Sequence, residues 1–374
     1  MKIFLYILLG ISIIIVGFFT WFFIFYLKIP KLPDLSIKNE TEKIISIDNW
    51  FQKLEKKGKF NGAVLFINKG EVQLKKSYGY TNFSKKEHLT IHSSFRLASV
   101  SKQFTAAGIM LLKEQSKIDF DDLITKYIPN FPYINVSIRH LLNQTSGIPD
   151  KYLDLAEKNK GKSSVLTNEK AINLLIENNP KINFTPNEKY EYSNTNYIVL
   201  AYLIEVISKQ TFEIFMKKEL FEPLKMYDTR VWNLMSKDKT FPNKTNSFDR
   251  FEEKDLKPSF VDGVAGDGGV FSSINDMEIW DKFWYSNKLM SLDNLKQAFI
   301  KPKLTNGKLS DYGFGWIINK DMIWHNGQWL GANTVIMRNI KNKNCLVILD
   351  NSSNIFFDKI IEELNTIGNK MYKQ

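Results

Sequence analysis

The sequence predicts an α/β (α+β) protein in which a layered α/β domain, built from both ends of the chain, is interrupted by a mostly helical domain. Two observations lead to this fold class. Strand-like runs lie at residues 60–80 and 312–351, whereas residues 119–256 show helical spacing of apolar residues and long polar connections. Strands near both ends of a chain can share one layer while the insert between them forms another. We expect a cleft between the two domains to hold the chemistry.

An N-terminal membrane anchor is predicted over residues 1–28. Residues 3–27 carry no charge, and an apolar helix of that length crosses about 30 Å of hydrocarbon. A signal peptide is the alternative, but it would have a shorter apolar region that ends at a small-x-small cleavage site. Lysines flank both ends of the run, so counting them does not favour export, although long domains cross membranes largely regardless of charge. We expect an anchored protein whose folded domain is extracytoplasmic, in the periplasm or at the cell surface.

The anchor is followed by a stem and then by the folded domain, residues 44–374. Residues 29–43 hold two prolines and alternating charges, which is typical of an exposed connection. Apolar residues then recur at helical spacing from Ile44 to Leu54 and stop before Gly58. This pattern predicts an amphipathic first helix.

A β-hairpin is predicted next, because the strand-like runs 60–67 and 71–80 flank Asn68-Lys69-Gly70. The stretch LASVSKQFTA then begins a helix that is expected to run from Ser99 to about Gln115. Both elements belong to the N-terminal part of the α/β layer.

The C-terminal third of the chain is expected to return to that layer. A glycine-rich turn, AGDGGV, precedes a helix opened by Ser273, with Asp276 three residues later in the spacing of a capping box. Four strand-like runs follow between residues 312 and 351, and residues 355–372 form a closing helix.

The composition argues against a nucleic-acid partner and against a metal site. The chain has 374 residues and a net charge of +11, but its lysines are spread along the chain without a basic helix or a stacking motif. We interpret this charge as a lysine-rich solvated surface. One cysteine and four histidines, without H-x-x-x-H or C-x-x-C spacing, leave no recognisable metal site. No cofactor is expected.

A serine and a lysine three residues apart open the helix near residue 99. Ser99 and Lys102 would lie on one helix face, and burial would disfavour the charged form of the lysine so that it could accept a proton. The alternative is an exposed helix start with a serine N-cap and Lys102 in solvent. A second S-x-x-K, at Ser236 and Lys239, shows that the pair alone has little specificity.

Two tripeptides could complete a site. Tyr-Ser-Asn at residues 192–194 lies between a proline-bearing loop and an apolar helix, so Tyr192 could face a cleft. The structural alternative makes Asn194 a helix N-cap and Tyr192 an ordinary packed aromatic. His-Asn-Gly at residues 325–327 lies between strand-like runs, where its glycine would let a substrate approach the strand backbone closely.

Taken in order, these motifs resemble the serine β-lactamase-like hydrolases, which include class C β-lactamases, D-alanyl-D-alanine carboxypeptidases and related esterases. The likeness extends from about residue 58 onward and rests on FRLASVSKQFTAAGIMLL, IRHLLNQTSGIPD, FTPNEKYEYSNTNY, LFEPLKMYDT, GDGGVFSSINDM, YGFGW and WHNGQWLGANTVIM. Tyr-Ser-Asn and His-Asn-Gly resemble variants of the second and third members of the S-x-x-K, S-D-N and K-T-G set. The resemblance implies a β-lactamase/transpeptidase-like fold with an antiparallel sheet flanked by helices.

The resemblance also implies a role for each motif residue. Ser99 would be the nucleophile, and Lys102 would lower the barrier to its deprotonation. Tyr192 would act as general base and then as general acid, and Asn194 would hydrogen-bond Lys102 and the substrate amide. Backbone N–H groups of Ser99 and Gln328 would form an oxyanion hole.

The strand from His325 to Gln328 would bind substrate, with two departures from the family pattern. His325 replaces the lysine of K-T-G, so a permanent positive charge is missing near neutral pH. Asn326 replaces the threonine and removes a hydroxyl that would help to hold a substrate carboxylate, while Gly327 is retained. These departures favour a peptidase or an esterase over an efficient β-lactamase.

We therefore expect a serine hydrolase that cleaves an amide or ester through acyl-Ser99. The partner would be a small-molecule or peptide substrate, with a D-Ala-D-Ala-type cell-wall peptide as the first expectation. A carboxylesterase or a weak class C-like β-lactamase is the alternative within the enzymes. A non-catalytic penicillin or peptide sensor is the alternative from another class of protein.

Overall fold

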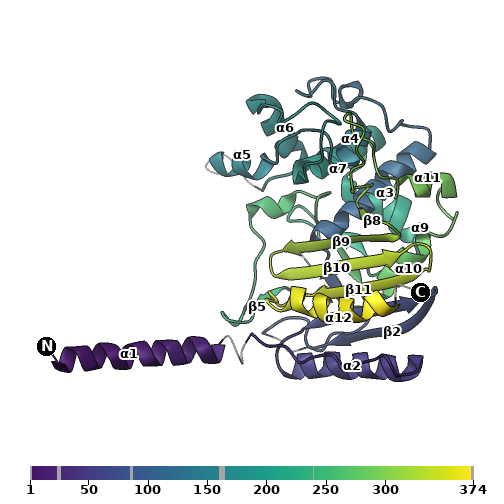
Figure 1. Ribbon diagram of the computed structural model, residues 1–374. Helices are drawn as coiled ribbons and strands as arrows, with labels where there is room; N and C mark the ends of the chain where they lie inside the picture. Colours follow the sequence, from purple (N-terminus) through teal and green to yellow (C-terminus); the bar gives the residue numbers. More distant parts are fainter. Residues whose placement is uncertain (1, 23–26, 85–86, 160–164, 239, 372–374) are drawn as a thin grey trace. The chain divides into compact units, whose positions relative to one another are not determined.

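The computed structural model describes residues 2–22, 27–84, 87–159, 165–238 and 240–371 (Figure 1). The chain forms two compact units. The first comprises Met1–Phe60 and Ile355–Gln374, and the second comprises Asn61–Asn354.

The first unit contains the helices α1 (Lys2–Trp21), α2 (Glu40–Lys56) and α12 (Phe357–Met371). Helix α2 confirms the predicted amphipathic helix, and it begins at a capping box between Asn39 and Glu42. Most residues of the predicted stem are exposed, but Ile29 and Leu35 are buried, and residues 40–43 already belong to α2. The indole N–H of Trp50 on α2 also donates a 2.7 Å hydrogen bond to the carbonyl of Pro30.

The predicted membrane anchor is not supported by the structure. That prediction required one continuous apolar helix over residues 3–27, whereas α1 ends at Trp21 and residues 23–26 lie outside the described residues. Among the helices of the described ranges, none combines the length and the apolar character that crossing a membrane requires.

A six-stranded antiparallel sheet forms the base of the second unit. Its strands are ordered β2-β1-β11-β10-β9-β8. The pairing of β1 with β11 places Gly62 opposite Asp350 and confirms that both ends of the chain share this layer. These two strands are interior to the sheet and buried, which explains their nearly continuous apolar sequences. The strands are β1 (Gly62–Asn68), β2 (Glu71–Tyr78), β8 (Ile317–Asn319), β9 (Met322–Trp329), β10 (Ala332–Asn339) and β11 (Asn344–Asp350).

The hairpin predicted between β1 and β2 is confirmed. Its two turn residues, Lys69 and Gly70, both have positive φ angles, of 52° and 84°. A two-residue turn with this geometry matches the twist of antiparallel strands.

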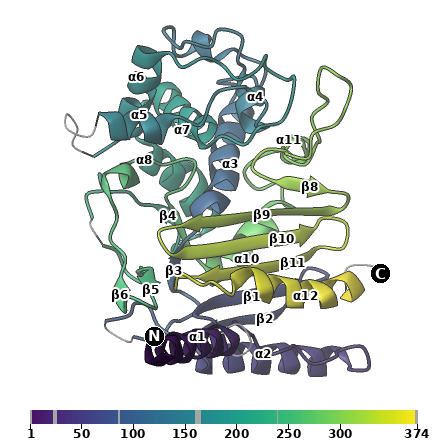
Figure 2. The same cartoon turned by 60° about the vertical axis from the view of Figure 1, so that its left-hand side comes forward.

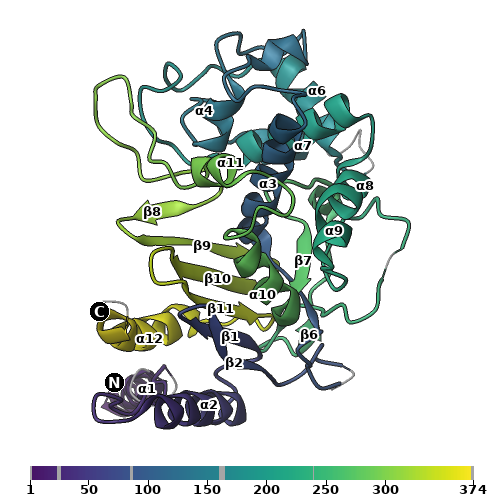
Figure 3. The same cartoon turned by 90° about the vertical axis from the view of Figure 1, so that its right-hand side faces the viewer.

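Helices and a smaller sheet complete the second unit. Helix α10 (Ile274–Phe283) lies against one face of the six-stranded sheet (Figure 3). A three-stranded sheet, ordered β3-β7-β4, places Phe271 of its central strand opposite both Arg96 and Arg230. Its strands are β3 (Ser94–Arg96), β7 (Val270–Ser273) and β4 (Arg230–Val231), and a separate pair is formed by β5 (Phe248–Asp249) and β6 (Lys254–Asp255).

Several of the remaining helices gather at one end of the second unit, and α3 (Ser101–Glu114) lies between them and the sheet (Figure 2). The described residues of the stretch that we predicted as helical, residues 119–256, contain six α-helices but also β4, β5 and β6. These strands have two residues each, which is too short for a periodic sequence signal. The helices are α4 (Ile138–Leu142), α5 (Tyr152–Lys158), α6 (Asn168–Asn178), α7 (Asn194–Ser208), α8 (Phe212–Met216) and α9 (Glu222–Leu224), and α11 (Leu292–Gln297) follows later.

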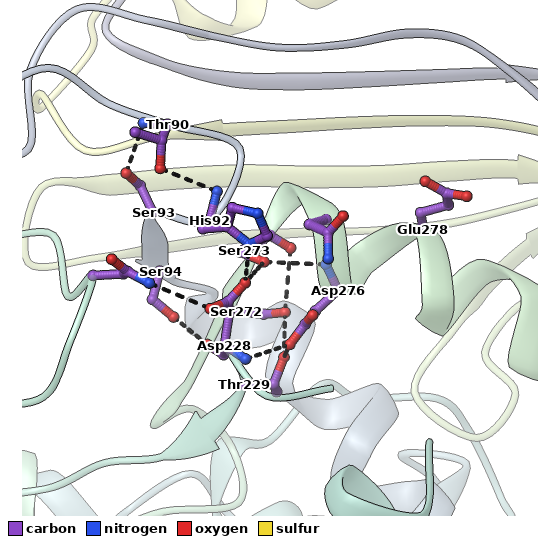
Figure 4. Close-up of polar contacts among 12 residues, drawn as sticks. Thr90, His92, Ser93, Ser94, Asp228, Thr229, Ser272, Ser273, Asp276 and Glu278 are labelled. Atoms are coloured by element: carbon purple, nitrogen blue, oxygen red, sulfur yellow. Dashed lines mark hydrogen bonds and ion pairs between the residues drawn. The ribbon is translucent and has the colours of Figure 1, made fainter. Parts of the chain in front are cut away.

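A polar cluster links the start of α10 to the turn before β4 (Figure 4). Ser273 caps α10 as predicted, since its hydroxyl accepts the backbone N–H of Asp276 at 3.1 Å. The Asp276 carboxyl does not complete a capping box. It accepts instead from the backbone N–H of Asp228 and from the hydroxyl of Thr229, both at 2.8 Å. His92 pairs with the Asp228 carboxylate from the other side, at 2.8 Å.

Candidate active site

Ser99 lies in a sharp turn between a strand and a helix. Strand β3 ends at Arg96, and a 3-10 turn over Ala98–Val100 leads directly into α3. Ala98 has a φ angle of 48°, in the left-handed region that residues with a Cβ seldom adopt. Ser99 is half-buried and lines a cavity of about 100 Å³. The turn therefore presents the serine to a small enclosed space.

Lys102 lies beneath Ser99 and is fully buried, which contradicts the alternative of an exposed helix start. Its ammonium group has three acceptors, the number that its three N–H groups require. They are the Ser99 hydroxyl at 3.2 Å, the side-chain oxygen of Asn194 at 2.8 Å and the backbone carbonyl of Asp267 at 2.8 Å. The amide and carbonyl oxygens can only accept, whereas the serine hydroxyl can also donate. Proton exchange along this network is thus possible only between Lys102 and Ser99.

Tyr192 lies beside this lysine. The Lys102 ammonium is 4.9 Å from the centroid of the Tyr192 ring, within the range of a cation–π contact. The ring also contacts Tyr312 and His325, at centroid distances of 6.0 and 6.1 Å. The structure therefore brings together residues of all three motifs. The lysine of the second S-x-x-K, Lys239, lies outside the described residues.

Asn194 is the first residue of α7 and not its N-cap, which is Ser193. Its side-chain oxygen faces Lys102, and its amide N–H donates to Asp150 at 2.9 Å. Asp150 also accepts from the backbone N–H and the hydroxyl of Thr195, at 3.0 and 3.1 Å. A carboxylate at a helix N-terminus is favourable for both hydrogen bonding and charge, so Asp150 fixes the start of α7 and the orientation of Asn194.

Sequence reasoning missed Asp150 and the carbonyl of Asp267. Asp150 ends the motif IRHLLNQTSGIPD, and it meets Asn194, which lies 44 residues further along the chain. A carboxylate after a turn motif was the only available signal. A backbone carbonyl has no signature in a sequence at all.

His325 is 2% exposed, and both of its ring nitrogens have partners in the protein. Burial lowers its pKa to about 3, and the charge of Lys102 acts in the same direction, so the ring is neutral at physiological pH. Nδ1 lies 2.6 Å from the carbonyl of Asn326 and must carry the proton. Nε2 then accepts from the Tyr312 hydroxyl at 3.0 Å. We predicted that this strand lacks a permanent positive charge. Burial of His325 contributes to this lack, in addition to the replacement of lysine by histidine.

Gly327 has a different use from the one that we predicted. A Cβ on this residue would lie 2.4 Å from the carbonyl oxygen of Leu97 and 2.8 Å from the backbone nitrogen of Ser99. Glycine here lets β9 approach the Ser99 backbone, whereas we had assigned the space to substrate. The next residue, Gln328, lines the same cavity as Ser99. The two residues expected to supply oxyanion-hole N–H groups therefore meet at one cavity.

The cavity reaches some of the predicted site residues and adds others. Ser99, Asn194 and Gln328 line it, whereas Lys102, Tyr192 and His325–Gly327 lie outside its lining. Among the added residues, Tyr152 donates from its hydroxyl to the Asp267 carboxylate at 3.1 Å. Burial raises the pKa of Asp267, and the positive charge of Lys102 opposes that rise. The remaining lining residues are Arg96, Ala98, Tyr152, Leu153, Val261, Asp262, Val264, Asp267, Gly268, Gly269 and Trp329.

No group of three or more His, Cys, Asp or Glu within the described ranges is arranged to hold a metal ion.

Comparisons with known proteins identify the family and the fold of this chain. The family model described as Beta-lactamase matches residues 47–363. Penicillin-binding protein 4* of Bacillus subtilis is 34% identical over 318 residues, which are 80% of this chain and 70% of that protein. Protein flp of Staphylococcus aureus is 26% identical over 333 residues, which are 84% of this chain and 65% of that protein. This chain thus spans slightly less than two thirds of flp.

Solved structures share the fold at lower identity. FmtA from Staphylococcus aureus aligns with a TM-score of 0.72 and 20% identity over 92% of this chain and 90% of that chain. The octameric penicillin-binding protein homologue from Pyrococcus abyssi aligns with a TM-score of 0.70 and 24% identity over 84% of this chain and 74% of that chain. The fold is accordingly the β-lactamase/transpeptidase-like α+β fold. Because the family model covers most of the sequence, this chain belongs to the β-lactamase family.

Proposed function

We propose that the protein is a serine hydrolase that transfers the acyl group of an amide or ester to Ser99 and then to water. One observation carries this proposal. Lys102 is buried directly below Ser99, and two acceptors that cannot donate hold it in place. Of its three hydrogen bonds, only the one to the Ser99 hydroxyl can exchange donor and acceptor. This is the arrangement that a lysine base needs in order to activate a serine.

Acylation would then proceed with each proton accounted for. With Lys102 in its neutral amine form, the Ser99 oxygen forms a bond to the substrate carbonyl carbon, the Ser99 proton passes to the Lys102 nitrogen, and the carbonyl π electrons move onto the carbonyl oxygen. Backbone N–H groups of Ser99 and Gln328 would stabilise that oxyanion. The tetrahedral intermediate collapses, and the leaving amine or alkoxide takes a proton through Tyr192, whose ring lies over Lys102. Water attacks the acyl-serine by the same route and releases the acid.

Asn194 would serve two purposes in this cycle. Its side-chain oxygen holds Lys102, and one of its two amide N–H groups is engaged by Asp150. The second N–H can donate to the acyl-side amide of a peptide substrate. Asp150 would therefore act on catalysis only through the orientation of Asn194.

A D-Ala-D-Ala-type cell-wall peptide is the substrate that we propose first, with the domain located outside the cytoplasm, where such peptides occur. The name of the Bacillus subtilis relative states that it binds penicillin, which supports a site for compounds of this shape. Efficient β-lactamase activity is not proposed, since the neutral His325 and Asn326 provide no permanent charge on β9.

A carboxylesterase is the second candidate, and the neutrality of His325 is the observation that favours it. A strand without a fixed charge does not require a charged substrate, so small neutral esters would enter the site without the cost of an unpaired ion. Turnover of aryl esters without acylation by penicillin would identify this activity.

The test is the intact mass of the full-length protein after exposure to penicillin and, separately, to an activated aryl ester. An adduct that disappears in Ser99→Ala but persists in Ser101→Ala, the neighbouring serine, supports the proposal. A short-lived adduct with turnover indicates a hydrolase, and a trapped adduct without turnover of any ester or peptide indicates a sensor. No adduct with either reagent would refute acyl transfer at Ser99.

A further inference from the structure

A buried arginine shares the cavity of the candidate nucleophile. Arg96 ends strand β3, three residues before Ser99, and both residues line the same cavity. Its side chain is 8% exposed, and its guanidinium lies 5.0 Å from the centroid of the Phe271 ring. This cation is therefore removed from bulk water but accessible to a molecule bound at Ser99.

The hydrogen-bonding capacity of Arg96 is mostly unused. A guanidinium carries five N–H groups, and within the described ranges its polar partner is Asp262 alone, through a single 3.2 Å contact. Asp262 is itself shared, since it also accepts from the indole N–H of Trp329 and the backbone N–H of Ser259, both at 2.8 Å. A buried guanidinium with spare donors is costly unless an anionic ligand completes its shell.

A second cation lies beside Arg96. The ammonium of Lys244 is 5.5 Å from the centroid of the Phe271 ring, the ring that Arg96 also contacts. Burial lowers the pKa of Lys244 to about 8, and the charge of Arg96 adds to this effect, while Asp255 opposes it. Arg96 and Lys244 thus both pack against the Phe271 ring, although Lys244 does not line the cavity.

Besides Asp262, which pairs with Arg96, the carboxylate that lines the cavity is Asp267. Asp267 accepts a hydrogen bond from Tyr152 and lies near Lys102, which offsets its charge. Strand β9 contributes no charge, because His325 is neutral and fully engaged by Tyr312 and the backbone. Among the described residues that line the cavity, Arg96 is the cation.

We propose that Arg96 is the subsite for a carboxylate carried by the substrate close to the scissile bond. The spare N–H groups of its planar guanidinium would bind both carboxylate oxygens, which is the geometry that arginine favours. Because Arg96 and Ser99 line one cavity, a single bound molecule can contact both residues. The proposal rests on the acyl-transfer function proposed above. It assigns binding of the substrate carboxylate to Arg96 of β3 and not to β9.

The test compares two aryl esters of one N-acylglycine, which differ only by a carboxylate or a carboxamide on the phenol. The full-length wild-type protein is expected to prefer the carboxylate ester in kcat/KM by about 10- to 100-fold, the range for a charge-assisted pair. Arg96→Gln should reduce this preference at least tenfold. Arg96→Lys should retain part of it, because an ammonium cannot form two parallel hydrogen bonds.

Arg230→Gln is the matched control. Arg230 stands opposite the same Phe271 from strand β4, and its guanidinium packs over Phe241 at 4.1 Å, but it does not line the cavity. Its substitution should leave the preference unchanged. A wild-type protein without preference, an equal loss for both esters in Arg96→Gln, or the same loss in Arg230→Gln would overturn the subsite. If Arg96→Gln does not fold, a full wild-type preference in Arg96→Lys would overturn the bidentate contact.

A binding experiment separates this proposal from the hydrolase function. N-acetyl-D-alanine and its amide are titrated into Ser99→Ala, with and without Arg96→Gln, by calorimetry. A carboxylate preference that depends on Arg96 in Ser99→Ala, together with no adduct and no turnover in the wild-type protein, would support the subsite and refute the hydrolase. Turnover without any carboxylate preference in either assay would refute the subsite and leave the hydrolase standing.

Discussion

Asp276 makes the stability of the protein depend on pH. Its side chain is 1% exposed and accepts hydrogen bonds from Asp228 and Thr229 (Figure 4). Burial raises its pKa from 3.8 to about 6; the hydrogen bond from Thr229 opposes this rise, and the charge of Asp228 adds to it. The folded state therefore holds a proton at pH 5, where the unfolded chain has released it.

The sign and size of the effect follow from this difference. Between pH 4 and pH 6 the folded state binds more protons than the unfolded state, so the free energy of unfolding falls as the pH rises. At about 1.4 kcal/mol per pKa unit, the interval from 3.8 to about 6 corresponds to about 3 kcal/mol. This contribution is fully present below pH 4 and is lost once the pH exceeds about 6.

Asp276→Asn removes the titration but keeps an oxygen that can accept from Asp228 and Thr229. Urea unfolding of wild type and variant at intervals from pH 4 to pH 8 measures the difference. The variant should gain about 3 kcal/mol relative to wild type on going from pH 4 to pH 7. Asp293→Asn, at a side chain that is 92% exposed, is the control for the substitution itself. Parallel pH profiles for wild type and Asp276→Asn would refute the reasoning.

Three further outcomes are expected. Asp150→Ala should slow acylation about 10- to 100-fold, because Asn194 loses the partner that orients it. The same substitution should lower the free energy of unfolding by about 1 kcal/mol, because it removes the cap on α7. Unchanged acylation in a quenched time course followed by mass spectrometry would contradict this role. Gly327→Ala should reduce the acylation rate about 100-fold or more, since the added Cβ would lie 2.8 Å from the Ser99 nitrogen. A near-normal rate in the same assay would show that β9 can move away from Ser99. Because the pKa of His325 is about 3, the pH–rate profile between pH 5 and pH 9 should contain no change that reports its protonation. An NMR titration in which the His325 ring protonates near pH 6.5 would show that this residue is not buried as described.

Elements with a strong periodic signal could be predicted from the sequence. The hairpin around Lys69 and Gly70, the amphipathic helix α2 and the pairing of both ends of the chain in one layer all follow from apolar spacing and turn residues. The burial of Ile29 and Leu35 within the stem could not, because the prolines and charges around them indicate exposure.

In the site, the side chains that belong to the S-x-x-K and Tyr-Ser-Asn motifs could be predicted, whereas the contacts made by residues outside these motifs could not. Ser99, Lys102 and Asn194 were found because the spacing of their motifs is informative, and the structure brings them within hydrogen-bonding distance. The carbonyl of Asp267 and the carboxylate of Asp150 depend on loops that meet only in three dimensions. Gly327 was recognised as a position of close approach, but a sequence cannot say whether a substrate or the protein itself occupies the space.

The pairing of Gly62 with Asp350 has a consequence for how the protein is made. Strand β1 is synthesised early, yet its neighbour β11 emerges after almost all of the second unit has been translated. Contacts of such long sequence separation form late, because a long loop must close before they stabilise anything. Until then β1 keeps one open edge, which is a template for pairing with other chains. Truncation within β10 or β11 should therefore yield aggregated protein, since β9 would lose its place in the sheet and Ser99 its opposing strand.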